Sequence, residues 1–558
     1  MMWGQCNARA GYCVVRAVVL VLIATIAGLL SQVGMAQSAG PPLEPLPERT
    51  VELPVMSCEA LASHPFTADV TFRVMSAAVQ SAQAGRGELC LVKGYVAPQV
   101  QFALYLPTRS YAGRYLQGGC GGMCGVIGDS LQPACDSAVA FGGSFAVGFN
   151  NSGHVGAGIG DGAWAKDAPE LREDYAFRAT HVAAIAAKAI VAAYYGKAPR
   201  WTYFQGCSDG GREALMESQR YPGDFNGIVA GSVFSMPAVM EQFLWDSHVA
   251  LTAQGAKILT SEATALLHRA VLEKCDPLDG VRDGQIDDPR LCHYDPGQLA
   301  CRKGRQPPAC LTSEQVTAAR LLYQGPMDGA GHKLFPGGLP YGSELLWSEP
   351  GALSSTGIAA GGFLQNLAFP NQLPTGFTWR DWTFDLPSFE RLDAAGAVYD
   401  PRSADLRAFR DAGGKLILWQ GTADQASGIS GMPAYYQDIR DVVGGLEAAR
   451  QFARLFLVPG VYHCGGGYIP YQEDFLGAMV NWVERGQAPV QVVAAARLQD
   501  GSVRRRPLFA YPERVRYVKG DVNDPHSFVG MMPAREPDDH YDWVGAGGSL
   551  TRSTSNAP

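Results

Sequence analysis

A serine inside a glycine-rich turn is the feature of this sequence with the clearest chemical meaning. The run Gly206-Cys207-Ser208-Asp209-Gly210 matches the pattern G-x-S-x-G. In that pattern the serine lies on a sharp turn from a strand to a helix, and small neighbours let the backbone bend that tightly. Residues 201–205 have strand character, and residues 213–220 have helix character. This setting favours a nucleophilic Ser208 over the alternative, a surface serine in an ordinary glycine-rich loop.

A serine hydroxyl needs a general base, and the base needs a carboxylate that orients it. In hydrolases with this turn the chain order is serine, acid, histidine. Asp424 follows a predicted strand at residues 415–419, and His463 follows another at residues 455–458. Because both predicted strands end at the edge of the sheet that holds the nucleophile, we predict a triad of Ser208, Asp424 and His463. The alternatives are a helix N-cap for Asp424 and a structural loop residue for His463.

The tetrahedral intermediate of such a reaction needs backbone N–H donors for its oxyanion. We expect Asp209, the residue after the nucleophile, to supply one donor. The glycine-rich segment 115–122 follows a short predicted strand, and we assign Gly118 as the second donor. The alternative for this segment is an ordinary flexible turn.

Cysteines adjoin both reactive residues, since Cys207 precedes Ser208 and Cys464 follows His463. A bridge between them would hold the nucleophile and base loops in register, as accurate positioning requires. The chain has 13 cysteines, two of which lie in the first 36 residues. In an exported protein the remaining odd number indicates disulfides plus one free thiol or an intermolecular bridge. No CxxC pair and no cysteine–histidine cluster has the spacing of a zinc site.

An acidic, glycine-containing loop lies between Cys275 and Cys292. Carboxylates this dense would repel one another without a cation, and calcium is bound by carboxylate and carbonyl oxygens of a chain that wraps around it. We expect a structural calcium site here. The alternative is a solvated acidic turn, because the spacing is not that of an EF-hand.

Length and composition favour a large domain with an insertion, or two domains. The chain has 558 residues, of which 47% are hydrophobic and 18% charged, so it can bury a large core. The net charge of -8, with no basic run beyond residues 504–506, argues against nucleic-acid binding.

The first 36 residues have the features of a signal peptide. Arg9 and Arg16 form a positive region, residues 17–30 are apolar, and Gly34-Met35-Ala36 is a small-x-small cleavage site. The alternative is an uncleaved membrane anchor, although the apolar stretch is short for a bilayer span. We expect a secreted or periplasmic chain with no later membrane span.

The alternation of strands and helices defines the predicted organisation. Residues 177–195 are alanine-rich and amphipathic, as is typical of a helix, and the pattern of a parallel α/β sheet continues to about residue 235. The pattern then stops and resumes near residue 404. The predicted segments are a signal peptide (1–36), an N-terminal lead (37–57), a core in two parts (58–235 and 404–535), an inserted lid (236–403) and a C-terminal tail (536–558).

These motifs resemble the tannase/feruloyl esterase family. The resemblance rests on residues 206–213, on Tyr221-Pro222, and on Val458-Pro459-Gly460 with His463-Cys464; residues 194–196, 224–231 and 481–484 add to it. It extends from about residue 58 to about residue 517. The family implies an α/β-hydrolase core with a lid inserted between the nucleophile and the acid.

The resemblance also implies ligands and bridges. For calcium it implies the side chains of Asp276, Asp279 and Asp283 and the carbonyl groups of Val281 and Gln285. It implies the disulfides Cys207–Cys464, Cys58–Cys90, Cys275–Cys292 and Cys301–Cys310. One pairing among Cys120, Cys124 and Cys135 stays open, and a C-terminal bridge of some relatives is replaced by Phe509 and Val529.

Family members hydrolyse feruloyl and other hydroxycinnamoyl esters, galloyl esters and, in one branch, mono(2-hydroxyethyl) terephthalate. That branch holds the free carboxylate of the substrate with a lid arginine, and the corresponding residues 358–363 of this chain contain none. The resemblance therefore predicts poor hydrolysis of terephthalate monoesters. Four lid aromatics are candidates for stacking on the substrate ring, with packing in the lid core as the alternative: Trp347, Phe363, Phe369 and Trp379.

We therefore expect a secreted serine carboxylesterase that acts on small aromatic esters, hydroxycinnamoyl esters first and galloyl or other aryl esters as the alternative. A calcium-dependent binding protein on an inactive hydrolase fold is the alternative of another class. A peptidase or an acyltransferase on the same fold also remains open. Nothing in the sequence indicates an oligomeric state or a nucleic-acid partner.

Overall fold

The computed structural model describes residues 43–82, 87–127, 144–157, 160–233, 235–349 and 352–545. All of them belong to the unit Pro41–Pro558. The predicted signal peptide and Cys135 lie outside the described residues.

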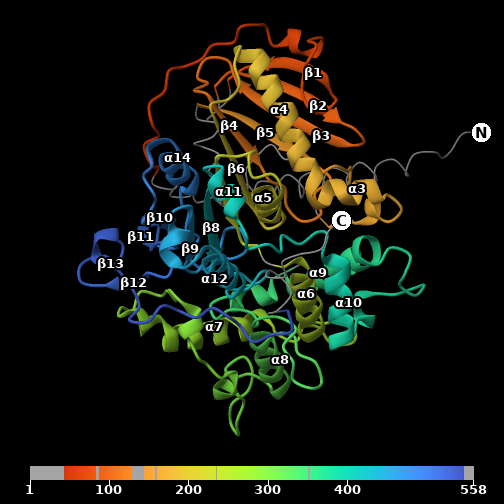
Figure 1. Cartoon of the computed structure of the whole chain (residues 1–558). Coiled ribbons are helices and arrows are strands. Elements are labelled where there is room, and N and C mark those ends of the chain that lie inside the picture. The colour runs from red at the N-terminus through yellow and green to blue at the C-terminus, as the bar shows by residue number, and fades with distance from the viewer. Residues whose placement is uncertain are drawn as a thin grey trace, which may run out of the picture. The chain divides into compact units, whose positions relative to one another are not determined.

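A mostly parallel sheet forms the centre of the described part of the chain (Figure 1). Its strand order is β1-β2-β3-β5-β4-β6-β7-β8-β9. The first three strands pair antiparallel, β5 is antiparallel to β3, and every later pairing is parallel. The strands are β1 (Phe72–Gln80), β2 (Leu89–Val96), β3 (Val100–Pro107), β4 (Arg114–Gly118), β5 (Phe145–Asn150), β6 (Trp201–Cys207), β7 (Gly227–Gly231), β8 (Lys415–Gly421) and β9 (Ala453–Val458).

The inner strands are buried on both faces, which explains their nearly continuous apolar sequences. Successive residues alternate between two cores. Leu416 and Leu418 of β8 join the core beneath α4 (Ala179–Tyr195), α5 (Asp209–Arg220) and α12 (Gly431–Val443). Ile417 and Trp419 join the core on the other face, with α14 (Phe475–Arg485).

The predicted elements around the site are present, with shifted ends. The strands predicted at 201–205, 415–419 and 455–458 correspond to β6, β8 and β9. The helix predicted at 213–220 begins earlier, at Asp209. Glycines 210 and 211 hide this start from a propensity argument, because glycine is a poor helix former. Both are needed for close packing, since a Cβ on Gly211 would lie 2.5 Å from the Gly231 carbonyl oxygen.

Between β7 and β8 the chain forms a helical insertion, which Figure 1 shows gathered below the sheet. Its helices are α6 (Met236–Ala250), α7 (Ser261–Cys275), α8 (Ser313–Gln324), α9 (Leu353–Phe363) and α10 (Leu386–Gly396). One cluster of buried residues lies within the insertion, and a second joins the insertion to core residues that include Met123 and Tyr175. We retain residues 236–403 as the proposed lid.

The remaining elements are short or C-terminal. The helices are α3 (Pro169–Glu173), α11 (Arg407–Asp411) and α13 (Leu446–Arg450), and the strand pairs are β10 (Gln491–Arg497) with β11 (Val503–Phe509), and β12 (Arg514–Tyr517) with β13 (Phe528–Met531). Phe509 packs against Gly530, next to Val529, so β11 and β13 lie together where relatives were expected to carry a bridge.

One helical stretch, Pro169–Tyr195, is long and apolar enough to cross a membrane by length and composition, contrary to the expectation that no later run would be. Many of its residues belong to the core, including Val182, Ile190 and Val191. Burial against the sheet explains its apolar character.

Candidate active site

Ser208 lies between the end of β6 and the start of α5, in a backbone conformation that side chains rarely adopt (φ 61°, ψ -123°). The turn closes only because its flanking residues are glycines. A Cβ on Gly206 would lie 2.3 Å from the Gly210 carbonyl oxygen, and one on Gly210 would lie 2.9 Å from the Cys120 carbonyl oxygen. The Ser208 amide donates to the Gly231 carbonyl oxygen of β7 at 3.0 Å, which ties the turn to the sheet. The strain presents the hydroxyl group above the sheet edge.

The three predicted triad residues form one hydrogen-bonded chain. The Ser208 hydroxyl lies 2.8 Å from His463 Nε2, and His463 Nδ1 lies 3.0 and 3.1 Å from the two Asp424 oxygens. With the proton on Nδ1, His463 donates to Asp424 and accepts from Ser208. Asp424 is fully buried and accepts four further hydrogen bonds, from the amides of Ala426 and Ser427, the Ser427 hydroxyl and Gln420 Nε2.

The electrostatics of the pair favour a charged histidine. Burial opposes the charge on Asp424, but the His463 imidazole and the hydrogen bonds outweigh burial and lower the pKa of Asp424. Burial likewise opposes a charged His463, and the Asp424 carboxylate outweighs it, so the pKa of the imidazole is raised. An imidazolium formed during proton transfer from Ser208 would therefore be stabilised.

A disulfide joins the two loops of the triad. Cys207 and Cys464, 257 residues apart in the chain, are bonded with a Cα–Cα distance of 5.8 Å. Each is the immediate neighbour of a reactive residue, so the bond limits how far Ser208 and His463 can separate.

The other predicted bridges are also formed in the structure, and the open pairing is resolved. The bonded pairs are Cys58–Cys90, Cys275–Cys292, Cys301–Cys310 and Cys120–Cys124. The sequence could not choose the last pair, because Cys135 was an equal candidate. The five disulfides found within the described residues are typical of proteins that fold in an oxidising compartment.

The loop after β4 supplies the residues nearest to the predicted oxyanion site. Gly118 is the last residue of β4, and the Gly119 amide donates to the Gln205 carbonyl oxygen at 2.9 Å. Gly122, rather than Gly118, is among the residues that line the cavity at Ser208. Asp209 also lines it, as the first residue of α5. Gly118 and Asp209 remain predicted donors.

An apolar cavity of about 110 Å³ opens above Ser208 and His463. Core and insertion both contribute to it. Its apolar lining residues are Met123, Val233, Met236, Val239, Met240, Phe243, Ala359, Phe363 and Ala426. No sequence pattern marked the methionines, because they are scattered along the chain and carry no motif.

Of the four candidate lid aromatics, Phe363 is the one that lines this cavity. Trp347 is buried in the insertion and donates from Nε1 to Ser343 Oγ at 3.0 Å. Phe369 stacks on Trp382 with 6.3 Å between ring centroids. The side chain of Trp379 packs beside Gly361. The structure therefore places these three aromatics in the packing of the insertion.

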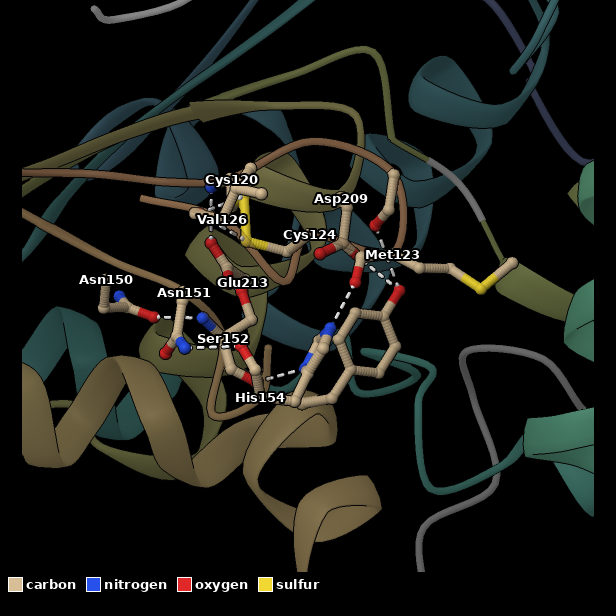
Figure 2. Close-up of a disulfide and its surroundings, with 12 residues drawn as sticks. Cys120, Met123, Cys124, Val126, Asn150, Asn151, Ser152, His154, Asp209 and Glu213 are labelled. Atoms are coloured by element: carbon tan, nitrogen blue, oxygen red, sulfur yellow. Dashed lines mark hydrogen bonds between the residues drawn. A yellow bond between two sulfur atoms is a disulfide. The ribbon is translucent and has the colours of Figure 1, made fainter. Parts of the chain in front are cut away.

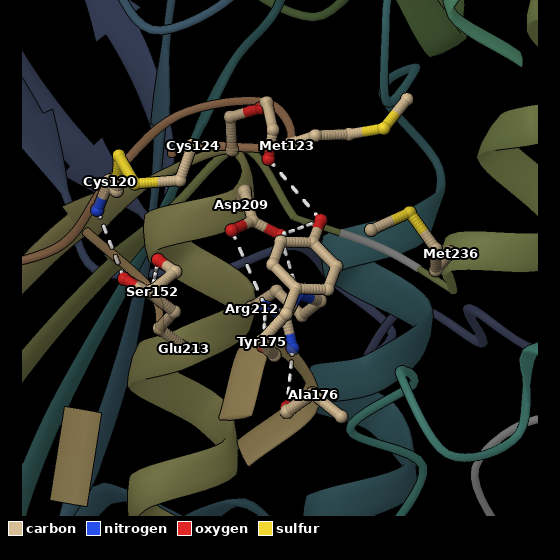
Figure 3. A network of polar contacts seen from close by, with 12 residues as sticks. Cys120, Met123, Cys124, Ser152, Tyr175, Ala176, Asp209, Arg212, Glu213 and Met236 are labelled. Carbon is tan, nitrogen blue, oxygen red and sulfur yellow. Dashed lines mark hydrogen bonds and ion pairs between the residues drawn. A yellow bond between two sulfur atoms is a disulfide. The ribbon is translucent and has the colours of Figure 1, made fainter. Parts of the chain in front are cut away.

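Arg212 lines the cavity, but its guanidinium group is already engaged (Figure 3). It donates from Nε to Asp209 at 2.6 Å, and from Nη1 and Nη2 to the carbonyl oxygens of Ala176 and Tyr175 at 2.6 and 2.7 Å. The Tyr175 hydroxyl donates to the same Asp209 oxygen at 2.8 Å. This network holds Asp209 in place and leaves Arg212 poorly suited to bind a substrate carboxylate.

The acidic loop, residues 276–288, contains buried charge without sufficient donors. Asp276 accepts from the amides of Asp283 and Gly284, both at 3.0 Å. By contrast, Asp279 Oδ2, Asp283 Oδ1 and Asp287 Oδ2 are buried and have no hydrogen-bond partner. Burial first, and then the neighbouring Asp287, raise the pKa of Asp279. The donor set fits a hard cation such as calcium, which prefers carboxylate oxygens.

Three features of the acidic loop were not predicted. Asp287, absent from the predicted ligand set, supplies one of the unpartnered oxygens, whereas Asp276 is satisfied by backbone amides. Arg506 of β11 donates to Asp283 Oδ2, so an arginine already offsets part of the negative charge. The Gln285 side chain accepts from the Tyr471 hydroxyl at 2.8 Å. The contact with β11 connects residues over 200 positions apart, which no local pattern reveals.

Two groups of side chains in the described residues bring ligand atoms close enough together to hold a metal ion, and the carboxylates of the acidic loop are in neither: His181, Glu217 and Asp224, and Asp438, Asp441 and His540. In the first group Lys188 Nζ already donates to the Asp224 carbonyl oxygen at 2.6 Å. Residues that could hold a metal ion are thus present in the structure, and calcium in the acidic loop stays a prediction.

A mostly parallel sheet, a serine on the strand-to-helix turn, and a histidine–aspartate pair on later strand ends define a serine hydrolase of the α/β-hydrolase class. The chain matches the family model described as tannase and feruloyl esterase over residues 85–531. It belongs to that family, and it is a carboxylic ester hydrolase.

Individual relatives agree with this assignment. The chain is 32% identical to an uncharacterized esterase of Xanthomonas campestris, and the alignment covers 79% of this chain and 84% of the relative. It is also 32% identical to the mono(2-hydroxyethyl) terephthalate hydrolase of Piscinibacter sakaiensis, with coverage of 80% and 85%. The crystal structure of feruloyl esterase B from Aspergillus oryzae superposes with a TM-score of 0.71 at 25% identity, covering 85% of this chain and all of that one.

Proposed function

We propose that this protein is a secreted serine carboxylesterase that hydrolyses esters of aromatic acids, feruloyl and other hydroxycinnamoyl esters foremost. The observation that carries the proposal is the hydrogen-bonded chain from Ser208 through His463 to Asp424 at the floor of an apolar cavity. Apolar cavities with few polar groups at one end suit an aromatic acyl group next to its reacting carbonyl.

In the proposed mechanism His463 takes the Ser208 proton while Oγ attacks the ester carbonyl carbon. Asp424 keeps the imidazole in the required tautomer and stabilises the imidazolium. Backbone amides of Asp209 and the loop after β4 stabilise the oxyanion. His463 then protonates the leaving alcohol, and water activated by His463 hydrolyses the acyl-enzyme to release the acid.

The acyl group is proposed from the cavity and from the relatives. Feruloyl esterases and a terephthalate monoester hydrolase are among the related proteins. Against a terephthalate monoester, no arginine occurs in residues 358–363 of α9, and the guanidinium group of Arg212 is committed to Asp209 and two carbonyl groups. A galloyl ester would bring several hydroxyl groups to an apolar wall, where unpaired polar groups are unfavourable. The apolar cavity and the engaged Arg212 therefore favour hydroxycinnamoyl esters over galloyl and terephthalate esters.

Calcium is proposed as a structural ion in the acidic loop. Asp279, Asp283 and Asp287 would hold it through their unpartnered oxygens, with Asp276 and the Val281 and Gln285 carbonyl groups as the other candidate ligands. The loop is separate from the residues that line the cavity, so the ion would stabilise the fold and take no part in the reaction.

The test is hydrolysis of methyl ferulate by the mature protein, with Ser208→Ala as the matched blank. Release of ferulate that disappears in the variant supports the proposal. Activity retained in Ser208→Ala would contradict Ser208 as the nucleophile. If the wild type labels with a fluorophosphonate but releases no ferulate, the triad stands and the hydroxycinnamoyl assignment is wrong. If it does not label, a binding protein on an inactive fold is favoured.

A further inference from the structure

The loop after β4 is closed by its own disulfide, Cys120–Cys124, with a Cα–Cα distance of 5.7 Å (Figure 2). The enclosed turn is unusual in its backbone. Gly122 and Cys124 both have positive φ, at 58° and 50°, and the Cys124 amide donates to the Gly121 carbonyl oxygen at 3.1 Å. A non-glycine residue with positive φ is uncommon and needs its surroundings to hold it. The cross-link restricts this turn to a narrow set of conformations.

Hydrogen bonds fasten the same loop at both of its ends. Glu213 of α5 accepts from the Cys120 amide at 3.0 Å, and its other oxygen accepts from the Ser152 hydroxyl at 2.6 Å. His154 Nε2 lies 2.7 Å from the Met123 carbonyl oxygen. These contacts join the loop to the nucleophile helix and to the segment after β5, as Figure 2 shows.

Met123, inside the disulfide loop, extends its side chain away from the disulfide and lines the cavity at Ser208 (Figures 2 and 3). Met123 is 6% exposed and belongs to the same buried cluster as Phe363 of the insertion. A Cβ added to Gly162 would lie 3.0 Å from Met123 Sδ, and one added to Gly362 of α9 would lie 3.6 Å from its Cε. The thioether is therefore enclosed between the core and the proposed lid.

A methionine side chain by itself restricts the size of a cavity only weakly, because it is unbranched and has three rotatable bonds. Its side chain can exclude a bulky acyl group only if its backbone is fixed and its neighbours limit its rotamers. The disulfide and Glu213 fix the backbone, and Gly162 and Gly362 leave just enough space for the thioether.

We propose that Met123 is a specificity-determining residue for the size of the acyl group, and that the Cys120–Cys124 disulfide and Glu213 are the positioning elements that make it so. The inference rests on the proposed function, because the cavity is an acyl site only if esters are the substrates. When Met123 is removed or its loop is released, the cavity accepts bulkier acyl groups relative to compact ones.

The test compares kcat/KM for methyl 3,4,5-trimethoxycinnamate and methyl cinnamate, with active sites counted by fluorophosphonate labelling. The ratio is the kcat/KM for the trimethoxycinnamate divided by that for the cinnamate. We expect Met123→Ala and the double variant Cys120→Ser/Cys124→Ser each to raise this ratio about fivefold or more. The triple variant should add little to either, because changes that act through one contact are not additive. Met123→Leu, which conserves volume, should keep the wild-type ratio.

The matched control is Cys301→Ser/Cys310→Ser, which removes a disulfide of the insertion whose residues do not line the cavity. It should leave the ratio unchanged. Glu213→Ala should raise the ratio, whereas Glu213→Gln, which keeps an acceptor for the Cys120 amide, should restore it. If Cys120→Ser/Cys124→Ser does not fold, the variants of Met123 and Glu213 still test the proposal.

Several results would overturn the inference. One is an unchanged ratio in Met123→Ala; another is an equal loss of activity on both esters in the Cys120→Ser/Cys124→Ser protein, which would show a merely structural bridge. Failure of the proposed function looks different, because the wild type itself would then hydrolyse neither ester, and the inference would fall with it.

Discussion

The catalytic corner, formed by Ser208, Asp424 and His463, and the acidic loop of residues 276–288 both bury carboxylates, but they satisfy them differently. Asp424 is fully buried, and both of its oxygens accept hydrogen bonds from the surrounding chain and from His463. In the acidic loop Asp279, Asp283 and Asp287 each keep one buried oxygen without a partner.

The difference shows which of the two regions has enough hydrogen-bond donors for its buried carboxylates within the chain itself. A buried charge is tolerated when it is paired and hydrogen-bonded, and it is strongly unfavourable otherwise. The catalytic corner has its donors in its own chain, so its geometry needs no ligand. The acidic loop needs a cation or protons from outside, so its contribution to stability should depend on the solution.

The largest expected effect comes from removing the carboxylate of the catalytic corner. Asp424→Asn should lower kcat about 10⁴-fold, because the amide no longer holds His463 in the tautomer that accepts the Ser208 proton. Because Asp424 raises the pKa of His463, the acidic limb of the kcat/KM profile should move to lower pH in the variant. A pH–rate profile measures both. A loss below tenfold would argue against Asp424 as the orienting carboxylate.

The next effect concerns the bridge across the catalytic corner. Cys207→Ser/Cys464→Ser should lower the free energy of unfolding by about 2–5 kcal/mol, because the bond closes a loop of 257 residues in the unfolded chain. It should also lower kcat up to about 10²-fold, since Ser208 and His463 can then separate. Urea denaturation and kinetics on one ester measure the two effects. Unchanged kcat with lower stability would limit the bridge to a structural role.

A chelator should lower the stability that the acidic loop contributes, whereas the geometry of the catalytic corner should be unaffected by it. Removing calcium with EGTA should lower Tm by about 2–5 °C, as expected for loss of an ion present at roughly 100 times its Kd. Asp279→Asn should make Tm insensitive to calcium, and Asp295→Asn, at an exposed ion pair with Arg320, is the matched control. If EGTA has no effect and Asp279→Asn raises Tm, protons rather than an ion satisfy the loop.

A pH-dependent effect is expected at Glu241 of α6, a buried carboxyl group with one partnered and one unpartnered oxygen. One oxygen accepts from Trp382 Nε1 at 3.0 Å, and the other is buried without a partner. Burial raises the pKa of Glu241 from 4.5 to about 8. The stability of the folded state should therefore fall as pH rises from about 4.5 to about 8, because the protonated form is favoured only in the fold.

Glu241→Gln keeps an acceptor for Trp382 and cannot ionise. The Tm of this variant should fall less than that of the wild type between pH 5 and pH 9, because only the wild type loses a stabilising proton as the pH rises through the raised pKa of Glu241. Parallel Tm profiles for the two proteins would show that Glu241 does not titrate in this range.

The nucleophile region shows how far local patterns reach. The strand, the turn and Ser208 are contiguous in the chain, and the glycines that the turn requires are visible as residue types. The start of α5 was placed too late for the same reason, because Gly210 and Gly211 weaken the helical pattern while serving the close packing of α5 on the sheet.

The lid aromatics show where local patterns stop. Trp347, Phe369 and Trp379 are large aromatic residues of the insertion, as Phe363 is, yet of these four only Phe363 is among the residues lining the cavity. Which face of an insertion helix meets the core depends on contacts between segments far apart in the chain. For this reason the sequence could not separate a ring that touches substrate from one that packs inside the lid.

By itself the sequence determined the class of protein, the order of Ser208, Asp424 and His463, and the acidic character of residues 276–288, because each depends on residue type and on neighbours within one strand or turn. The tertiary structure alone decided the pairing of Cys120 with Cys124, the unpartnered oxygen of Asp287 and the methionine wall of the cavity. These features arise where distant segments meet, and burial and donor supply at such meeting points are set by the packing of the whole fold.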